Sequence, residues 1–191
     1  IPSSPADELD EELEFLAARL SRSFGGLNGS VSLNLLSKDV DRGFEILRAV
    51  LAAPSFQEDK LALRKIQALQ GLKQRNDDSK NIESRERNFL AYGEDFWFNR
   101  HTTAASLERI RREDLLTFHH EWVHPRNFIV SISGDFDRKA MLKRLDGVFA
   151  AWPHLGKKTP PVPQQREYGK SGVYIVDKDV NQGRVSIIMP G

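Results

Sequence analysis

The 191-residue sequence contains no cysteine, which excludes disulfide bonds and thiolate metal ligands. Its 28 basic and 27 acidic residues leave a net charge of only +1. This balance lacks the excess of positive charge by which proteins bind nucleic acid or an anionic membrane. No apolar run approaches the roughly 18 residues that a membrane-spanning helix needs. We therefore predict no nucleic-acid partner and no membrane span.

Several common catalytic motifs are also missing. The chain has no G-x-S-x-G sequence, no glycine-rich phosphate loop and no cysteine nucleophile. Hydrophobic residues nevertheless make up 39% of the chain, which is enough for a packed core. The composition therefore predicts a globular protein, and its function has to be sought in less common motifs.

A third absence lies in the longest helical pattern. Ser55 followed by Glu58 matches a capping box, which predicts that a helix starts there. The apolar residues of this helix recur at steps of three and four and predict one buried face, namely Leu61, Ala62, Ile66, Leu69 and Leu72. Residues 60–76 contain no Asp or Glu. This helix therefore offers no carboxylate as a metal ligand or as a catalytic base.

The remaining patterns mix helices with strands. The first helix is predicted from Ser3 along an apolar stripe that ends at Leu20, before the breaker 25–29. Further helices are predicted over 43–52, 82–92, 106–110, 112–123 and 138–151. Strands are predicted over 31–35, 127–133, 172–176 and 184–189. We therefore predict an α+β fold, in which helices pack on a mixed or antiparallel sheet.

A proline-rich stretch divides the chain. Residues 154–166 read as an extended linker. We predict that residues 1–153 form the α+β domain and that 167–191 are strands that begin or complete a following half-domain. Because the sequence starts with Ile1 and stops within a strand pattern at Gly191, we expect a segment of a longer protein, truncated at its N-terminus.

Residues 120–124, His-Glu-Trp-Val-His, match the zincin motif H-E-x-x-H. In that motif both histidines bind zinc from one helical face. Here the second histidine precedes Pro125, which predicts the end of the helix. We favour a chance match at a helix end over a zinc site. Nearby, Asp135 and Asp137 are interpreted as caps of the helix that follows.

Four segments together resemble one family. They are residues 25–32, 41–56, 110–116 and 124–135, the last reading His-Pro-Arg-Asn-Phe-Ile-Val-Ser-Ile-Ser-Gly-Asp. Their order and spacing resemble those of the insulinase or pitrilysin-type metallopeptidases, which include the mitochondrial processing peptidases. The resemblance covers about residues 9–153 and implies a half-domain of that type. The tail from Val173 is similar to the start of the second half-domain.

Active halves of this family bind zinc through an inverted H-x-x-E-H motif. They add a glutamate ligand, with another glutamate seven residues before it, on a helix that resembles residues 60–78. This sequence has no H-x-x-E-H, and Arg64 and Gly71 stand at the two glutamate positions. The resemblance therefore implies a non-catalytic domain that has no catalytic residue and no metal ligand. Zinc is expected only in a partner half.

Such a domain would pair with a homologous zinc-bearing half or subunit and enclose a peptide substrate. The resemblance also implies an edge that holds peptides by strand addition, at Asn28, Gly29 and Ser30. The alternative for these three residues is an ordinary turn into a sheet. Two other functions stay open: a fragment of an active zinc endopeptidase whose H-x-x-E-H precedes residue 1, and a structural scaffold. The resemblance points to a periplasmic or exported bacterial protein, while the residues themselves leave the compartment unknown.

Overall fold

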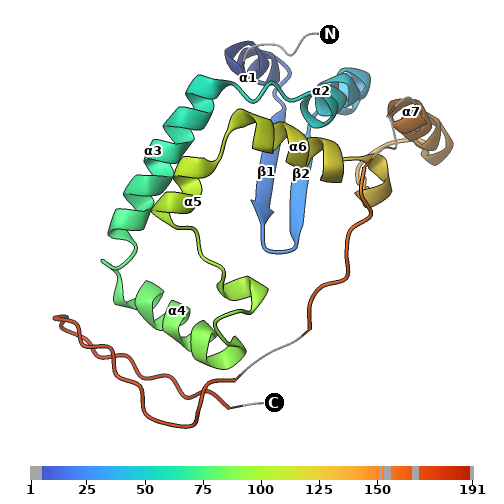
Figure 1. The fold of residues 1–191 in the computed structure, drawn as a ribbon. Helices are drawn as coiled ribbons and strands as arrows, with labels where there is room; N and C mark the ends of the chain where they lie inside the picture. The colour runs from blue at the N-terminus through green and yellow to red at the C-terminus, as the bar shows by residue number, and fades with distance from the viewer. Residues whose placement is uncertain (1–5, 151, 153–155, 165–167, 190–191) are drawn as a thin grey trace. The chain divides into compact units, whose positions relative to one another are not determined.

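The computed structural model of the chain describes residues 6–150, 152, 156–164 and 168–189. Its helices and strands, labelled in Figure 1, are α1 (Ala6–Phe15), β1 (Arg19–Gly25), β2 (Asn28–Asn34), α2 (Val40–Ala52), α3 (Glu58–Gln74), α4 (Ser79–Tyr92), α5 (Ala104–Arg109), α6 (Arg112–Trp122) and α7 (Arg138–Ala150). Short 3₁₀ turns occupy Ser37–Asp39, Trp97–Asn99 and Pro125–Asn127. The predicted α+β class is confirmed, because helices accompany a two-stranded antiparallel sheet.

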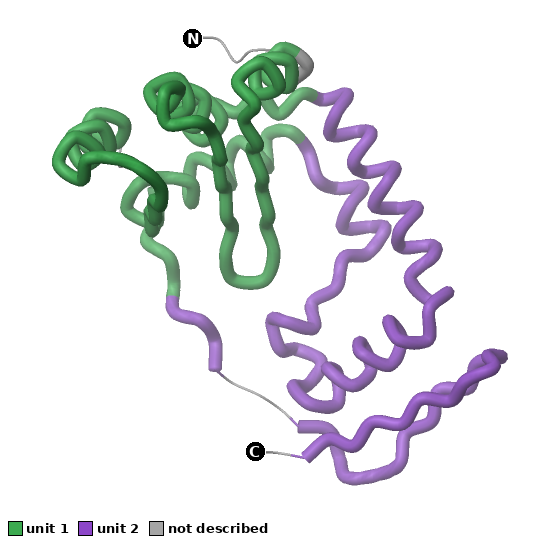
Figure 2. Tube along the Cα trace, turned by 180° about the vertical axis from the view of Figure 1, so that it is seen from behind, with its two compact units in different colours: residues 1–57, 112–160 green, residues 58–111, 161–191 purple. Residues whose placement is uncertain are grey.

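The chain forms two compact units, each built from two separate stretches of sequence (Figure 2). Unit 1 contains residues 1–57 and 112–160, and unit 2 contains residues 58–111 and 161–191. The predicted boundaries at 153–154 and 166–167 lie outside the described residues, so the division into domain, linker and following strands stays a prediction. Among the described helices, none has the length and apolar character to cross a membrane.

Unit 1 has its core where α2 and α7 pack together. Ile46 on α2 and Met141 on α7 are 3% and 5% exposed. Trp152 is also buried, and its ring meets the ring of Phe128 edge-on at 5.6 Å. The strands join this core through α2, since a Cβ built on the buried Gly43 would lie 3.3 Å from the side chain of Leu33. Glycine therefore lets the helix approach the apolar side chains of β2.

The first helix is shorter than its apolar stripe predicts. It ends at Phe15, and residues 19–25 form β1 rather than more helix. Ala17 has a φ of 48°, its N–H bonds to the carbonyl of Glu14, and the N–H of Ala18 bonds to the carbonyl of Leu13. These two bonds make a Schellman ending, which usually has glycine at the left-handed position. The predicted helix up to Leu20 is therefore wrong, while its predicted start at Ser3 lies outside the described residues.

In unit 2, α3 packs against α5. The Lys65 ammonium donates to the carbonyls of Glu108 and Ile110 at 2.9 and 2.8 Å. The predicted buried face of α3 is only partly correct, because Ile66 is 64% exposed whereas Leu69 is half-buried. The predicted end of α4 is confirmed at Gly93, which has a φ of 85°.

The predicted start of α3 is also wrong. The helix begins at Glu58, three residues after the expected cap Ser55. The backbone of Phe56 has a φ of 42°, which cannot continue into a right-handed helix. The capping-box pattern therefore lies just before the helix rather than at its first turn.

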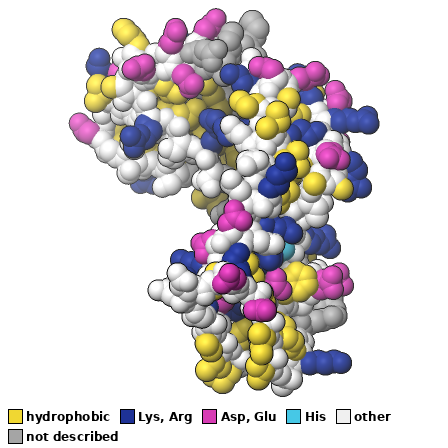
Figure 3. All heavy atoms as spheres, turned by 90° about the vertical axis from the view of Figure 1, so that its left-hand side faces the viewer, with side chains coloured by type: hydrophobic (Ala, Val, Ile, Leu, Met, Phe, Trp, Pro, Cys, Tyr) yellow, Lys and Arg dark blue, Asp and Glu magenta, His cyan; other side chains and the backbone are white. Residues whose placement is uncertain are grey.

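Three of the four predicted strands are absent from the described residues. Segments 128–133, 172–176 and 184–189 are extended but belong to no sheet. Their apolar residues are largely uncovered: Ile129, Val173, Ile175, Val185 and Ile187 are 85–100% exposed. Figure 3 shows hydrophobic side chains exposed on the surface of the face it draws. A strand needs a neighbouring strand for its backbone hydrogen bonds, and these segments have none among the described residues.

Candidate functional site

The three residues predicted to hold a peptide begin strand β2. In the hairpin Asn28 pairs with Gly25, Gly29 with Phe24, and Ser30 with Ser23. All three are exposed. The two strands are joined by a two-residue loop whose first residue, Gly26, has a φ of 57°. Glycine adopts this backbone conformation without a steric penalty, so the sequence favours a tight hairpin here.

The hairpin has two chemically different faces. Residues opposite each other in a sheet point to the same side, so Leu20 and Leu33 share one face. On that face the Phe24 ring lies over Gly29, where a Cβ would come within 2.4 Å of the ring carbons. The opposite face is polar and exposed, and it carries Ser21, Ser23, Asn28, Ser30 and Ser32. The apolar face of the hairpin is therefore the one that is partly buried, at Leu20 and Leu33.

Each strand of the hairpin keeps one edge without a partner strand in the described part of the chain. An unpaired strand edge offers backbone N–H and C=O groups to an extended peptide. The geometry at Asn28, Gly29 and Ser30 is compatible both with strand addition and with an ordinary turn into a sheet. Their role in peptide binding stays a prediction.

Helix α3 carries Arg64, and Gly71 follows two turns later; these are the positions at which the resemblance implies glutamates in active halves. Arg64 bonds to Gln67 on the next turn at 3.1 Å. Gly71 is exposed, and a Cβ built there would meet no atom within 4 Å. The fold therefore has room for a longer side chain at position 71. Steric crowding therefore does not explain why position 71 lacks a carboxylate side chain.

The H-E-x-x-H histidines lie in different surroundings. His120 is exposed in the last turn of α6, whereas His124 follows the helix and is 2% exposed. The backbone of His124 is extended, with φ −152° and ψ 158°, so the two rings do not share a helical face. His124 Nε2 instead donates to the carbonyl of Lys157 at 3.0 Å. The ring of His124 thus binds a backbone segment of the chain.

Glu121, the central residue of the motif, contacts the same partner. Its backbone carbonyl accepts the Lys157 N–H at 2.7 Å, and its carboxylate pairs with the Lys157 ammonium at 2.6 Å. The side-chain amide of Asn127 donates to the carbonyl of Lys157 at 3.1 Å. We call Glu121, His124, Asn127 and Lys157 the Lys157 clasp. It fastens the first part of the proline-rich stretch to the end of α6.

A further histidine was not singled out by sequence reasoning. His119 on α6 bonds through Nε2 to the carbonyl of Leu51 at 2.7 Å, and its ring meets Phe56 edge-on at 5.9 Å. It therefore stabilises the end of α2 and the chain after it. Its position one turn beyond the half-buried Leu115 is the pattern that predicts an inward-facing residue.

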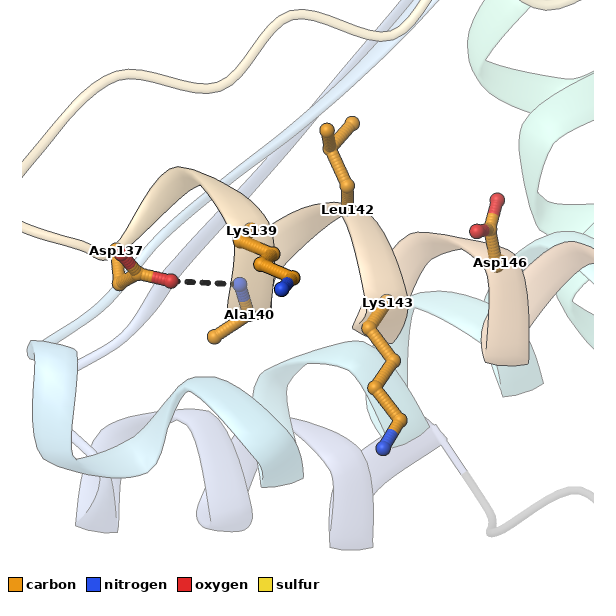
Figure 4. Close-up of a pocket in the computed structure, with 6 residues that line it drawn as sticks. All are labelled: Asp137, Lys139, Ala140, Leu142, Lys143 and Asp146. Carbon is orange, nitrogen blue, oxygen red and sulfur yellow. Dashed lines mark hydrogen bonds between the residues drawn. The ribbon is translucent and has the colours of Figure 1, made fainter.

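A shallow hollow of about 560 Å³ runs along α7 (Figure 4). Its lining comes from that helix and its cap, namely Asp137, Lys139, Ala140, Leu142, Lys143 and Asp146. Asp137 accepts the backbone N–H of Ala140 at 2.8 Å, which confirms its predicted role as a helix cap. The other charged side chains, two lysines and one aspartate, lie along an exposed helix face, as is usual for a solvated surface.

Two arginines, each bound to carboxylates, shape the electrostatics of unit 1. Arg144 donates to Asp41 at 2.5 and 3.3 Å, and this hydrogen bonding lowers the pKa of the Asp41 carboxyl and raises the pKa of Arg144. The Arg42 guanidinium contacts the carboxylates of Glu12 and Glu45, whose hydrogen bonds raise its pKa. These charges join α1, α2 and α7. In the described ranges, no group of three or more His, Asp or Glu side chains is arranged to hold a metal ion.

Comparison with known proteins gives a match to one family model over part of the chain and a likeness in fold to solved structures. The family model described as the peptidase M16 inactive domain matches residues 109–191. The structure of a peptidase M16 inactive domain from Pseudomonas fluorescens is similar, with a TM-score of 0.74 and 21% identity over 86% of this chain. A protease from Helicobacter pylori has a TM-score of 0.72 and 15% identity over 86% of this chain.

The chain spans 40% of the length of each of these two structures. Among curated proteins, no relative matches the chain. The family match and the fold nevertheless agree with each other and with the segments quoted from the sequence. The predicted resemblance to the insulinase-type metallopeptidases, and to their non-catalytic type of domain, is therefore confirmed.

Proposed function

We propose that this chain is part of a non-catalytic half that pairs with a homologous zinc-bearing half and helps to enclose peptide substrates. The observation that carries this proposal is helix α3, where Arg64 and Gly71 replace the expected carboxylates in a helix with no Asp or Glu between residues 60 and 76. Zinc with two histidines and no third protein ligand would be held poorly. The family description as an inactive domain supports the same conclusion.

In this proposal the β1–β2 hairpin supplies a substrate contact. In an antiparallel pair, alternate residues direct their backbone groups toward the partner strand and away from it. If the pair Gly25–Asn28 next to the loop is the first hydrogen-bonded pair, Gly29 and Val31 direct theirs to the free edge of β2. An extended peptide could then add there through backbone bonds, with little dependence on its sequence.

Pairing and absence of catalysis are tested on the full-length protein from its native source. We expect a homologous peptidase half to co-purify, whether on the same chain or as a separate subunit. Zinc should reside in that partner only, as measured by elemental analysis of the separated chains. Peptide degradation should fall when this chain is removed. Stoichiometric zinc bound by residues of this chain would contradict the proposal, as would undiminished peptide degradation without it.

The peptide edge is tested by removing backbone donors one at a time. Gly29→Pro and Val31→Pro each remove an N–H that points to the free edge and should weaken binding of an extended peptide. At position 29 the exposed Phe24 ring must also turn away from the new Cβ, so the Gly29→Pro result counts only where the variant is folded. Ser30→Ala is the matched control, because strand addition does not use this side chain. Binding is measured by fluorescence anisotropy and folding by circular dichroism. Folded proline variants that bind peptide as tightly as the parent protein would exclude this edge.

A further inference from the structure

A hollow of about 240 Å³ in unit 2 is lined by basic and polar side chains and by no acidic one. The residues come from three segments: Leu72 from the last turn of α3 with Arg75 just after it, Asn81 and Arg85 from α4, and His101 with Thr102 from the loop before α5. Neither the proposed peptide edge nor the Lys157 clasp uses any of them. We call these six residues the basic hollow.

Sequence spacing explains why these side chains converge. Leu72 and Arg75 are three residues apart and so share one face of α3, or of the turn that follows it. Asn81 and Arg85 are four residues apart and share one face of α4. The turn after α3 and helix α4 therefore contribute one arginine each to the hollow. The apolar side chain of Leu72 adds a non-polar wall beside these charged groups.

The segments that carry the hollow are held by interactions of their own. Arg85 Nη1 donates to Asn76 Oδ1 at 3.1 Å, which ties α4 to the turn after α3. Asp78 caps α4 by accepting the Lys80 N–H at 2.8 Å. Thr103, which follows His101 and Thr102, forms a capping box with Ser106 at the start of α5. The segments that carry the lining groups are therefore held in place without a ligand.

The charges within the hollow are not all neutralised by protein partners. Arg85 is bound to Glu86 through Nε at 3.2 Å, so its charge is partly satisfied. Within the described residues, however, no side-chain hydrogen bond or ion pair engages Arg75 or His101. A guanidinium beside amide, hydroxyl and imidazole groups matches the donors that bind carboxylate or phosphate oxygens.

We propose that the basic hollow binds a small oxyanion, either a carboxylate or a phosphate group. Arg75 would supply the main free charge, and Asn81, His101 and Thr102 would donate hydrogen bonds. Arg85 would contribute through the part of its guanidinium that does not face Glu86. The proposal does not depend on pairing with a zinc-bearing half or on strand addition at β2.

Binding is tested by NMR titration with inorganic phosphate and with two forms of one peptide, with a free and with an amidated C-terminus. We expect saturable shifts confined to residues of the basic hollow. Tighter binding of the free peptide than of phosphate would identify a carboxylate as the ligand, and the reverse order would identify a phosphate. No saturable shift with either probe would overturn the proposal.

The matched variants are Arg75→Gln and Lys73→Gln. Both remove one exposed positive charge from the end of α3, but only Arg75 lines the hollow. We expect Arg75→Gln to weaken binding about tenfold, since a hydrogen bond to a charged group is lost, and Lys73→Gln to leave it unchanged. Equal weakening by both variants would show non-specific attraction to positive charge and would sink the proposal.

Discussion

The Nε atom of Arg112 donates to the backbone carbonyl of Phe56 at 3.0 Å, while its Nη2 atom donates to the carbonyl of Ser55 at 3.0 Å. One guanidinium at the start of α6 therefore binds the carbonyls of two successive residues that lie more than fifty positions earlier in the sequence. Of these two residues, Phe56 has the left-handed φ of 42°. This contact fixes the non-helical chain between α2 and the start of α3.

Loss of the Arg112 guanidinium should destabilise unit 1. Arg112→Met removes both donors and leaves two part-buried carbonyls without partners, so we expect a loss of about 1–3 kcal/mol. Arg112→Lys should cost less, because a single ammonium can still reach one carbonyl. Chemical denaturation measures both values. As a control, the exposed Arg126→Met should change stability by less than about 0.5 kcal/mol. An unchanged midpoint for Arg112→Met would show that the contact does not stabilise the fold.

The same contact explains why α3 starts two residues later than a cap at Ser55 predicts. Ser55 and Glu58 have the spacing of a capping box, which is a local signal. The side chain that decides the backbone at Phe56 comes from α6, more than fifty residues later. No local pattern reports such a contact. The long-range hydrogen bonds of Arg112 therefore decide the backbone here, although Ser55 and Glu58 have the spacing of a capping box.

The end of α1 could not be predicted from the sequence, because helices that end in a Schellman motif usually have glycine where this chain has Ala17. We predict that Ala17→Gly stabilises the protein by about 0.5–1 kcal/mol, since glycine adopts a φ of 48° without the penalty that a Cβ brings. The neighbouring Ala18→Gly should instead destabilise by about 0.4–1 kcal/mol through backbone entropy alone. Thermal unfolding would show opposite signs for the two variants. A loss of stability in both would contradict the conformation of Ala17.

The strand predictions succeeded only where the sequence also provides a partner. The alternation at Val31 and Leu33 is confirmed because Gly26 allows a tight turn that brings β1 beside β2. The runs at 128–133, 172–176 and 184–189 alternate or repeat apolar residues equally well. Their pattern reports a preference for extended backbone, but a sheet also requires a neighbour at hydrogen-bonding distance.

The candidate site was predictable to a similar extent. The absence of carboxylates around Arg64 and Gly71 can be read directly from the sequence. The basic hollow could not be, because Arg75, Arg85 and His101 are brought together by the packing of α3, α4 and the loop before α5. The sequence shows which side chains are present, but only the packed fold shows which of them lie close together.

The pair Asp41–Arg144 should make stability depend on pH in the acid range. The pKa of Asp41 is lowered below its ordinary value of 3.8, so its contribution is present above that value and is lost as the pH falls through the lowered pKa. We expect a small coupling in the double-mutant cycle of Asp41→Asn and Arg144→Gln at pH 7. Because both groups are exposed, high salt should reduce it. On the same helix, Asp146→Asn should show no such coupling to Arg144. A coupling that persists well below the lowered pKa would contradict this account.

The two histidines of H-E-x-x-H should differ sharply when each is replaced by alanine. In a zinc site both substitutions would abolish metal binding. In this structure only His124 is buried, and it lies so close to Gly156 that a Cβ there would be 1.9 Å from the ring. His124→Ala removes this packing and the bond to Lys157, so we expect a loss of about 2–4 kcal/mol. The exposed His120→Ala should change stability by less than about 0.5 kcal/mol.

Hydrogen exchange provides the second measurement for these variants. In the parent protein the amide of Lys157 should be protected, because it bonds to the carbonyl of Glu121, whereas the amide of the exposed Lys158 should exchange quickly. His124→Ala should abolish the protection of Lys157, and His120→Ala should leave it intact. An equal loss of Lys157 protection in both variants would contradict this account. It would indicate that both histidines act in one site, as they do in the zincin motif. A loss of protection confined to His124→Ala would show that the Lys157 clasp depends on His124 and not on His120.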